Sequence, residues 1–378
     1  MRAVELMEAA TAQLDRASLA IDRSQEAMAE AEDFDRRFPA GSWLPPLGGV
    51  PLLVGSALVE KGCYSAANAL SSAERVLSHP IINALVRDGA LVVGCTSVSA
   101  NLSVHPIAPR DRIDAASPMD EDPLALALWR GAVAVGVSVE DLDSIATRVR
   151  LGIASYRPTL GFAPSVDYPK MATIMVVAHT LVEQAYLLDR LRAIGVRGDP
   201  RFVPHANPKS LATFAASPSR PPRIGVWSLA ATTAHDGGAT VVGAGTTCIE
   251  TLEARGVPLD TVALSASALS YFRRCMRIGP ALGGSAAISL ASGDSGAWCK
   301  SVAEVDQLFD TAEVVIVATP TDAVGEHSDA QTVWSLTQLA NLPMAVLPDA
   351  GVTLVGPRFG DASLLRAAAW LGEVVASQ

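Results

Sequence analysis

Charged residues and cysteines are scarce in this 378-residue chain. Charged side chains make up 18% of it and hydrophobic ones 49%, a balance that is typical of globular α/β enzymes and excludes a disordered chain. The formal net charge of −10 provides no basic footprint, so we expect no nucleic-acid surface. The five cysteines form neither a CxxC pair nor a metal knuckle. A cytoplasmic protein with small, buried cysteines is therefore the simplest expectation.

Long uncharged hydrophobic segments are also missing. No apolar run reaches the length of about eighteen residues that suggests a transmembrane helix, so we expect no membrane span. Residues 1–5 do not begin a charged region followed by an apolar core, so we expect no secretory signal. The six histidines show neither HxH nor HExxH spacing, which argues against zinc. The sequence thus predicts no metal and no cofactor.

Short apolar runs alternate with segments of helical periodicity along the chain. Residues 3–36 predict two helices, residues 81–88 one more, and residues 171–194 one long amphipathic helix. The Pro- and Ser-rich segment 196–222 predicts a loop. Strands are expected at 50–54, 90–95, 132–137, 223–227, 314–318, 345–348 and 352–355. This alternation predicts an α/β fold with a largely parallel or mixed sheet.

Five blocks of the chain match the pattern of one known family. Residues 352–365, VTLVGPRFGDASLL, are similar to GxQLVGPRFGEATLL, and residues 339–348, LANLPMAVLP, are similar to NLAGLPAxSVP. The block at 318–321, ATPT, resembles a TPT strand end. Residues 84–96 and 177–189 resemble LRxAGAIxxGKT and xARTVxDAALLLD. These are patterns of the amidase signature family, and the resemblance extends over nearly the whole chain.

The resemblance implies the amidase signature fold, a single large mixed β-sheet flanked by helices on both faces. It also implies one domain over residues 1–378. Within it, N-terminal helices (1–48) precede a signature-like core (49–195), a variable region (196–310), and C-terminal core strands with a helix (311–378).

Members of this family hydrolyse amides with a Ser–cis-Ser–Lys triad, a variant of nucleophile–base catalysis. Residues 49–56, GVPLLVGS, resemble the strand end that bears the lysine base, and Gly55 stands at the lysine position. Glu121 stands at the cis-serine position, while the nucleophile position falls on Leu142, Asp143 or Ser144 according to how the loop is aligned. A general base contributes roughly 10²–10⁴-fold to the rate. Because this chain lacks the lysine base at the position that the resemblance assigns to it, the resemblance implies that amide hydrolysis is absent or very slow.

Acidic residues stand where the family has its catalytic loops. One group comprises Asp120, Glu121 and Asp122, and the other comprises Glu140, Asp141 and Asp143. Because these loops face each other in the family's fold, the carboxylates could share one cleft. There they would raise one another's pKa and bind a cationic ligand or a hard cation. The alternative is that both loops are solvated turns, the first of them starting a helix.

Asp120, Glu121, Asp143 and Ser144 are therefore the candidate catalytic residues. Three functions stay open at this point. In the first, the chain is a non-hydrolytic homologue that serves as partner subunit of an active enzyme or binds a small molecule. Alternatively, it is a repurposed enzyme that uses acidic residues on an acyl or amide-like metabolite, or a weak amide hydrolase that uses Ser144. The family often forms dimers, so a homodimer is a further expectation.

Overall fold

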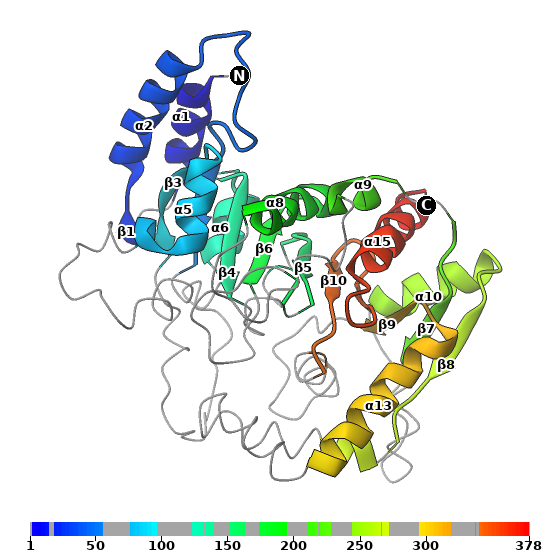
Figure 1. The fold of residues 1–378 in the computed structure, drawn as a ribbon. Helices are drawn as coiled ribbons and strands as arrows, with labels where there is room; N and C mark the ends of the chain where they lie inside the picture. Colours follow the sequence, from blue (N-terminus) through cyan, green and yellow to red (C-terminus); the bar gives the residue numbers. More distant parts are fainter. Residues whose placement is uncertain are drawn as a thin grey trace, which may run out of the picture.

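A computed structural model places much of the chain in one mixed β-sheet with helices on both faces (Figure 1). The residues it describes are 2–14, 19–55, 76–96, 123–131, 133–139, 148, 151–159, 161–162, 174–194, 210–217, 220–227, 244–265, 267–271, 295–318, 337 and 340–377. The sheet has eleven strands in the order β1-β3-β2-β4-β6-β5-β10-β11-β9-β7-β8.

The strands are β1 (Leu19–Asp22), β2 (Pro51–Val54), β3 (Leu91–Thr96), β4 (Val135–Val139), β5 (Ser155–Arg157), β6 (Ile174–Ala178), β7 (Ile224–Trp227), β8 (Leu259–Val262), β9 (Val314–Ala318), β10 (Met344–Leu347) and β11 (Val352–Val355). The helices are α1 (Ala3–Gln13), α2 (Ser24–Arg37), α5 (Pro80–Arg87), α6 (Pro123–Trp129), α8 (Leu181–Ile194), α9 (Leu211–Ala215), α10 (Ala244–Ala254), α13 (Ser295–Thr311) and α15 (Asp361–Ala376).

Parallel and antiparallel pairs both occur in the sheet. Strand β2 runs parallel to β3 and β4, and β7 runs parallel to β8 and β9. Every pair between β4 and β9 is antiparallel. The prediction of an α/β fold with a single mixed sheet is confirmed.

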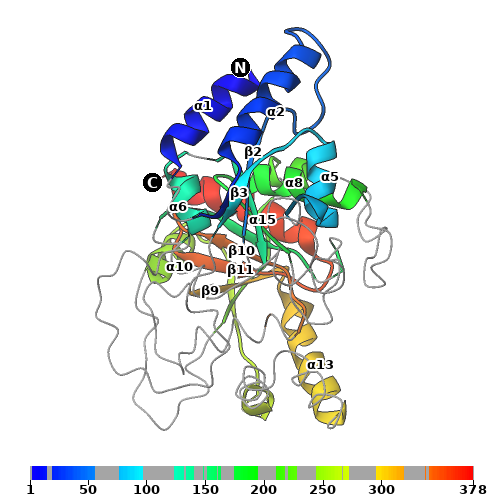
Figure 2. The same ribbon diagram turned by 90° about the vertical axis from the view of Figure 1, so that its left-hand side faces the viewer.

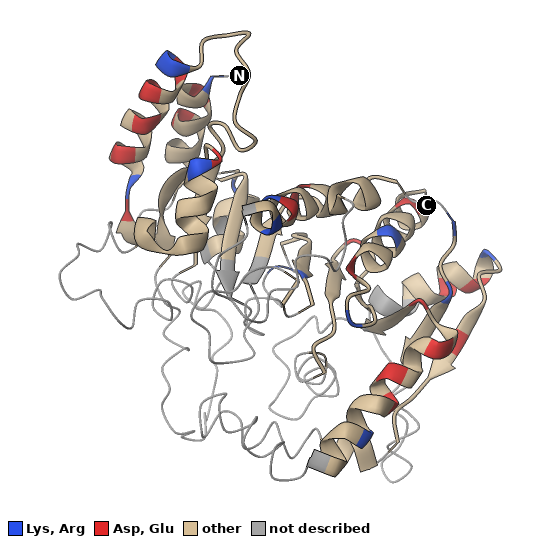
Figure 3. Cartoon of the chain, in the orientation of Figure 1, with Lys and Arg blue, Asp and Glu red and all other residues tan. Residues whose placement is uncertain are grey.

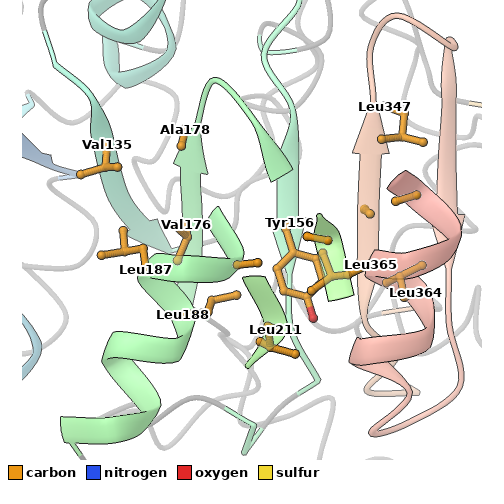
Figure 4. Close-up of a cluster of buried hydrophobic side chains, with 14 of the residues drawn as sticks. Val135, Tyr156, Val176, Ala178, Leu187, Leu188, Leu211, Leu347, Leu364 and Leu365 are labelled. Atoms are coloured by element: carbon orange, nitrogen blue, oxygen red, sulfur yellow. The ribbon is translucent and has the colours of Figure 1, made fainter. Parts of the chain in front are cut away.

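One apolar layer lies on each face of the sheet. Helices α5, α8, α9, α10 and α15 pack on one face, and helices α1, α2, α6 and α13 pack on the other. Along β2, Leu52 and Val54 face the first layer and Leu53 faces the second, and each side chain is 0% exposed. A strand buried on both faces is apolar at every position, which is why an unbroken apolar run predicted it. Figure 4 shows the first layer, in which Leu188 and Leu365 approach Tyr156.

The contact between α6 and β4 depends on a glycine. Gly136 lies in β4, and a Cβ atom there would lie 2.4 Å from Leu124 Cδ1 of α6. A side chain at this position would force Leu124 or its helix to shift, because a packed interior has little room for it.

Helices α1 and α2 lie side by side, as Figures 1 and 2 both show. Asp35 of α2 accepts hydrogen bonds from the backbone N–H groups of Ala3 (2.8 Å) and Val4 (3.1 Å), so it caps the N-terminus of α1. Partial burial acts to raise the pKa of Asp35, but these two bonds and the charge of Arg2 outweigh it and hold that pKa below its usual value.

The prediction of one long helix over residues 171–194 is wrong. Strand β6 occupies 174–178, and helix α8 begins only at Leu181. Ile174 to Ala178 form an apolar run rich in branched side chains, which favours a buried strand between β4 and β5. Thr180 then starts the helix through a capping box, since its N–H donates to the Glu183 carboxylate (2.9 Å) and the Glu183 N–H donates to Thr180 Oγ1 (3.2 Å).

The other predicted elements agree with the structure more closely. Two helices lie within residues 3–36, but the short strand β1 between them was not predicted. The predicted loop 196–222 contains the short helix α9. Within the part of the chain that is described, no helix combines the length and the apolar character needed to cross a membrane.

Candidate functional site

The candidate site lies at the carboxyl ends of β2, β3 and β4. These strands are parallel neighbours, so their carboxyl ends meet at one edge of the sheet. Helix α5, which leads from β2 to β3, packs on one face, and α6, which leads from β3 to β4, packs on the other. Ligands of open α/β sheets bind beyond the carboxyl ends of strands whose connections diverge to opposite faces in this way. The topology therefore makes this edge a candidate binding site.

Gly55 lies at this edge, directly after β2. It is buried, and its N–H donates to the carbonyl oxygen of Val137 in β4 at 2.8 Å, which continues the ladder between the two strands. The backbone position is thus fixed by the sheet. Glycine has no side chain, so position 55 provides no amine at this edge of the sheet.

The other residues predicted for the site lie outside the described residues. They are Asp120, Glu121, Asp122, Glu140, Asp141, Leu142, Asp143 and Ser144. The structure therefore brings together Gly55 and the ends of β3 and β4, and leaves the roles of these side chains as predictions. Among the described residues, no group of three or more His, Cys, Asp or Glu is arranged to hold a metal ion.

The described strand ends at this edge are small or apolar. Val54 and Val137 are fully buried, and the Sγ of Cys95, buried in β3, lies 3.6 Å from the carbonyl oxygen of Thr96. A thiol is only a weak hydrogen-bond donor. None of the residues that end β2, β3 and β4 in the structure carries a carboxylate, an amine or an imidazole.

A buried polar cluster that the sequence did not reveal lies elsewhere, between β5 and the start of α15. The Tyr156 hydroxyl donates to Asp361 Oδ1 at 2.5 Å, the Thr159 backbone N–H donates to the same oxygen at 3.0 Å, and Thr159 Oγ1 donates to Oδ2 at 2.7 Å. All three side chains are fully buried. Burial raises the pKa of Asp361 even though these donors act to lower it. Burial, and then the Asp361 charge, raise the pKa of Tyr156 well above its usual value.

This cluster joins two segments that lie far apart in the chain. Thr159 follows β5 and Asp361 begins α15, and the two residues are 202 positions apart. Because a substrate cannot reach fully buried side chains, the cluster is structural.

Two further buried polar side chains hold backbone segments together near β5. Gln184 Nε2 donates to the carbonyl oxygens of Ala154 (2.6 Å) and Ala178 (3.1 Å), and an Arg157 guanidinium N–H donates to the carbonyl oxygen of Leu342 (2.7 Å). These bonds satisfy carbonyl groups of buried residues, so both side chains stabilise the fold.

Cysteine chemistry also finds little support in the described residues. Cys248 of α10 is buried, and burial raises the pKa of its thiol to about 11. A thiol with such a pKa is almost entirely protonated at neutral pH and is a poor nucleophile. Cys299 of α13 is exposed and free.

Comparison with known proteins gives a likeness of fold. No family model and no curated protein sequence matches the chain. Solved structures match almost all of it. A structure described as a vestigial protein complex that reveals the evolutionary origins of an s-triazine catabolic enzyme has a TM-score of 0.68 and 18% identity, covering 99% of this chain and 95% of that one.

Two hydrolases are similar to the same degree. A 6-aminohexanoate cyclic dimer hydrolase complexed with substrate gives a TM-score of 0.66 at 15% identity, covering 99% of this chain and 94% of that one. A bacterial aryl acylamidase belonging to the amidase signature enzymes gives 0.67 at 14%, covering 99% and 93%. At these identities the likeness establishes architecture and leaves activity open. The chain therefore has the fold of the amidase signature enzymes.

Proposed function

We propose that this chain is a non-hydrolytic protein with the amidase fold, which acts as the partner subunit of an active enzyme or binds a small molecule. The observation that carries the proposal is the presence of glycine, which has no side chain, at position 55. The sheet fixes the backbone of this residue at the carboxyl end of β2 through the hydrogen bond to Val137. Glycine has no side chain that could act as a base there.

The loss of the base has a calculable effect. A serine hydroxyl is a weak nucleophile until a neighbouring base takes its proton, and general-base catalysis contributes roughly 10²–10⁴-fold. The described ends of β3 and β4 offer no lysine, histidine or carboxylate as a replacement. Ordinary amide hydrolysis is accordingly absent or very slow.

A role in a complex has independent support. One of the structures that share this fold is a vestigial protein complex, in which the fold takes part in an assembly. A chain that keeps the amidase architecture but lacks the base at β2 is suited to such a role, because the packing that supports an interface does not depend on the catalytic groups.

The test compares three proteins on an aryl amide: the unaltered chain, Gly55→Lys, and Gly55→Met as a control of similar bulk without an amine. We expect no turnover above buffer from the unaltered chain, and no more from Gly55→Lys than from Gly55→Met. A fluorophosphonate should leave Ser144 unlabelled. Turnover by the unaltered chain near the median enzyme rate of about 10 s⁻¹ would refute the proposal.

One observation favours a second candidate, a repurposed enzyme. Residues 97–122 lead from the carboxyl end of β3 to α6, and residues 140–147 begin directly after β4. Both acidic groups therefore belong to connections that leave from the edge that holds Gly55. In this alternative Glu121 and Asp143 act as acid and base on an acyl or amide-like metabolite, with Asp120 beside them. Thermal shifts with a panel of short-chain amides and amines, lost in Glu121→Gln and Asp143→Asn, would support it.

A further inference from the structure

A second set of parallel strands ends in diverging connections, at the opposite edge of the sheet from Gly55. Strands β7, β8 and β9 are parallel to one another, and the antiparallel pairs from β4 to β9 reverse their direction relative to β2. After β7 the chain passes through α10 on the first apolar layer, and after β8 it passes through α13 on the second. The carboxyl ends of β7 and β8 therefore meet the same topological condition for ligand binding as the edge at Gly55.

Trp227, the last residue of β7, carries a buried hydrogen-bond donor that has no acceptor in the described part of the chain. The residue is 4% exposed and belongs to the second layer, together with Val262, its partner in β8. The indole Nε1 is shielded from solvent, and no described group accepts a hydrogen bond from it. A buried tryptophan N–H normally has an acceptor, so this donor is an exception that requires an explanation.

Two further aromatic side chains belong to the same layer. Because α13 joins β8 to the parallel strand β9, it runs back toward the amino end of β9 and starts near the carboxyl ends of these strands. Trp298 lies in the first turn of α13, and the centroid of its ring is 6.4 Å from that of Tyr271. Tyr271 is buried in the second layer, and Trp298 packs against that layer. Aromatic rings thus border the end of the layer that contains Trp227.

Hydrogen bonds hold the segment after β8 against α13. The Ser265 hydroxyl donates to Glu304 Oε2 of α13 at 2.5 Å and accepts a bond from the Ala268 N–H at 3.2 Å. The Ser265 N–H also donates to Glu304 Oε2, at 3.3 Å. The chain that leads from β8 to Tyr271 is therefore positioned by the fold itself, and a ligand would not have to order it on binding.

The charges near these strand ends favour an uncharged ligand. Helix α13 carries three acidic residues and one lysine (Figure 3), and Asp260 lies in β8. Since the whole chain also has a net charge of −10, an anion would be repelled. The indole N–H donates and cannot accept, so it does not serve the donor groups of a cation. A flat, uncharged molecule with a carbonyl oxygen or ring nitrogen fits both the donor and the aromatic rings.

We propose that the carboxyl ends of β7 and β8 form a second binding site, in which Trp227 donates a hydrogen bond to a flat, uncharged ligand and Tyr271 and Trp298 contact its ring. The ligand supplies the acceptor that Trp227 lacks among the described residues. Because the site lies at the opposite edge of the sheet from Gly55, it does not depend on whether the chain hydrolyses amides.

Two probes of the same shape test the proposal. Acetophenone has a carbonyl acceptor, and α-methylstyrene has a CH₂ group in place of that oxygen. In the full chain with ¹⁵N-labelled tryptophan, NMR shows one indole N–H resonance for each of the six tryptophans. Phe exchanges of the other tryptophans identify the resonance of Trp227. We expect acetophenone, and not α-methylstyrene, to shift this resonance downfield in a saturable manner, because the N–H proton gains an acceptor.

Trp227→Phe keeps an aromatic ring and removes the donor, so it should weaken acetophenone binding about fivefold, the usual effect of one hydrogen bond. Trp43→Phe is the matched control, since Trp43 is 82% exposed in the loop after α2, and it should leave the affinity unchanged. An unmoved Trp227 resonance, equal affinity for the two probes, or equal weakening by both exchanges overturns the proposal. If circular dichroism shows that Trp227→Phe does not fold, the resonance and the two probes decide in the unaltered chain.

Discussion

The Tyr156→Phe exchange tests the buried cluster that joins β5 to α15. It removes one hydroxyl and leaves the ring in place, so packing is kept while Asp361 loses its 2.5 Å donor. No solvent reaches this 0% exposed carboxylate to replace the bond. A hydrogen bond to a charged group contributes about 1.5–3 kcal/mol, and we expect a loss of that size in the free energy of unfolding. The two bonds from Thr159 remain, which keeps the loss below the roughly 3–5 kcal/mol of an unpaired buried charge.

This loss should depend on pH. Burial raises the pKa of Asp361 above its ordinary 3.8, so the folded chain binds the proton more tightly than the unfolded chain does. The stability from this group is fully present below pH 3.8 and falls as the pH rises through the folded pKa. Because the Tyr156 hydroxyl lowers that pKa, Tyr156→Phe raises it further. The difference between the two proteins is therefore smallest at low pH and grows toward neutral pH.

Urea unfolding followed by far-UV circular dichroism, at pH 7 and near the ordinary carboxyl pKa, measures both effects. Tyr186→Phe is the matched control. Tyr186 is exposed, and its hydroxyl also donates to a backbone carbonyl oxygen, that of Pro46, at 3.1 Å. We expect the control to stay within about 0.5 kcal/mol of the unaltered chain. The reasoning fails if Tyr156→Phe is as mild as this control, or if its cost is the same at both pH values.

Three further predictions concern the fold and its thiols. Asp35→Asn should cost about 1 kcal/mol at pH 7 through the cap of α1; because the pKa of Asp35 is lowered in the folded chain, urea titrations should show this cost disappearing as the pH falls below 3.8. Gly136→Ala should lower stability by about 1–3 kcal/mol by overpacking β4 against α6, whereas Gly372→Ala, with open space at the new Cβ on α15, should raise stability by about 0.5–1 kcal/mol in thermal unfolding. Iodoacetamide followed by peptide mapping should label Cys299 in the native protein and spare Cys248 until denaturant is added; early labelling of Cys248 would contradict its burial.

The buried strands were predictable because their environment is uniform. Strands such as β2 and β3 are covered on both faces, so their sequences are continuous apolar runs. Strand β5 escaped prediction because Ser155 and Arg157 interrupt such a run over only three residues. The pairing with β6 and β10 that makes it a strand involves distant parts of the chain. Strand β6 was taken for a helix because Ile174 and Val177 also fit the apolar stripe that continues into α8.

The strand that ends before Gly55 was predictable, whereas the role of this edge of the sheet as a functional site stays a prediction. The position of Gly55 after a buried strand follows from local sequence, and the sheet confirms that position. The Tyr156–Thr159–Asp361 cluster could not be foreseen, because nothing in the spacing of the residues connects positions 202 apart. Contacts of that kind follow from topology, which hydrophobic periodicity does not encode.

Strand β10 lies between β5 and β11, although it follows β5 only after most of the chain has been made. Until β10 has been synthesised, the backbone N–H and C=O groups along one side of β5 therefore lack their partner strand. Another nascent chain can pair with such an open strand edge. Release of residues 344–355 seals that side, and the Asp361 carboxylate then finds its three donors. Truncations before residue 344 should consequently yield aggregated protein rather than a smaller folded unit, because they leave one side of β5 without its partner β10.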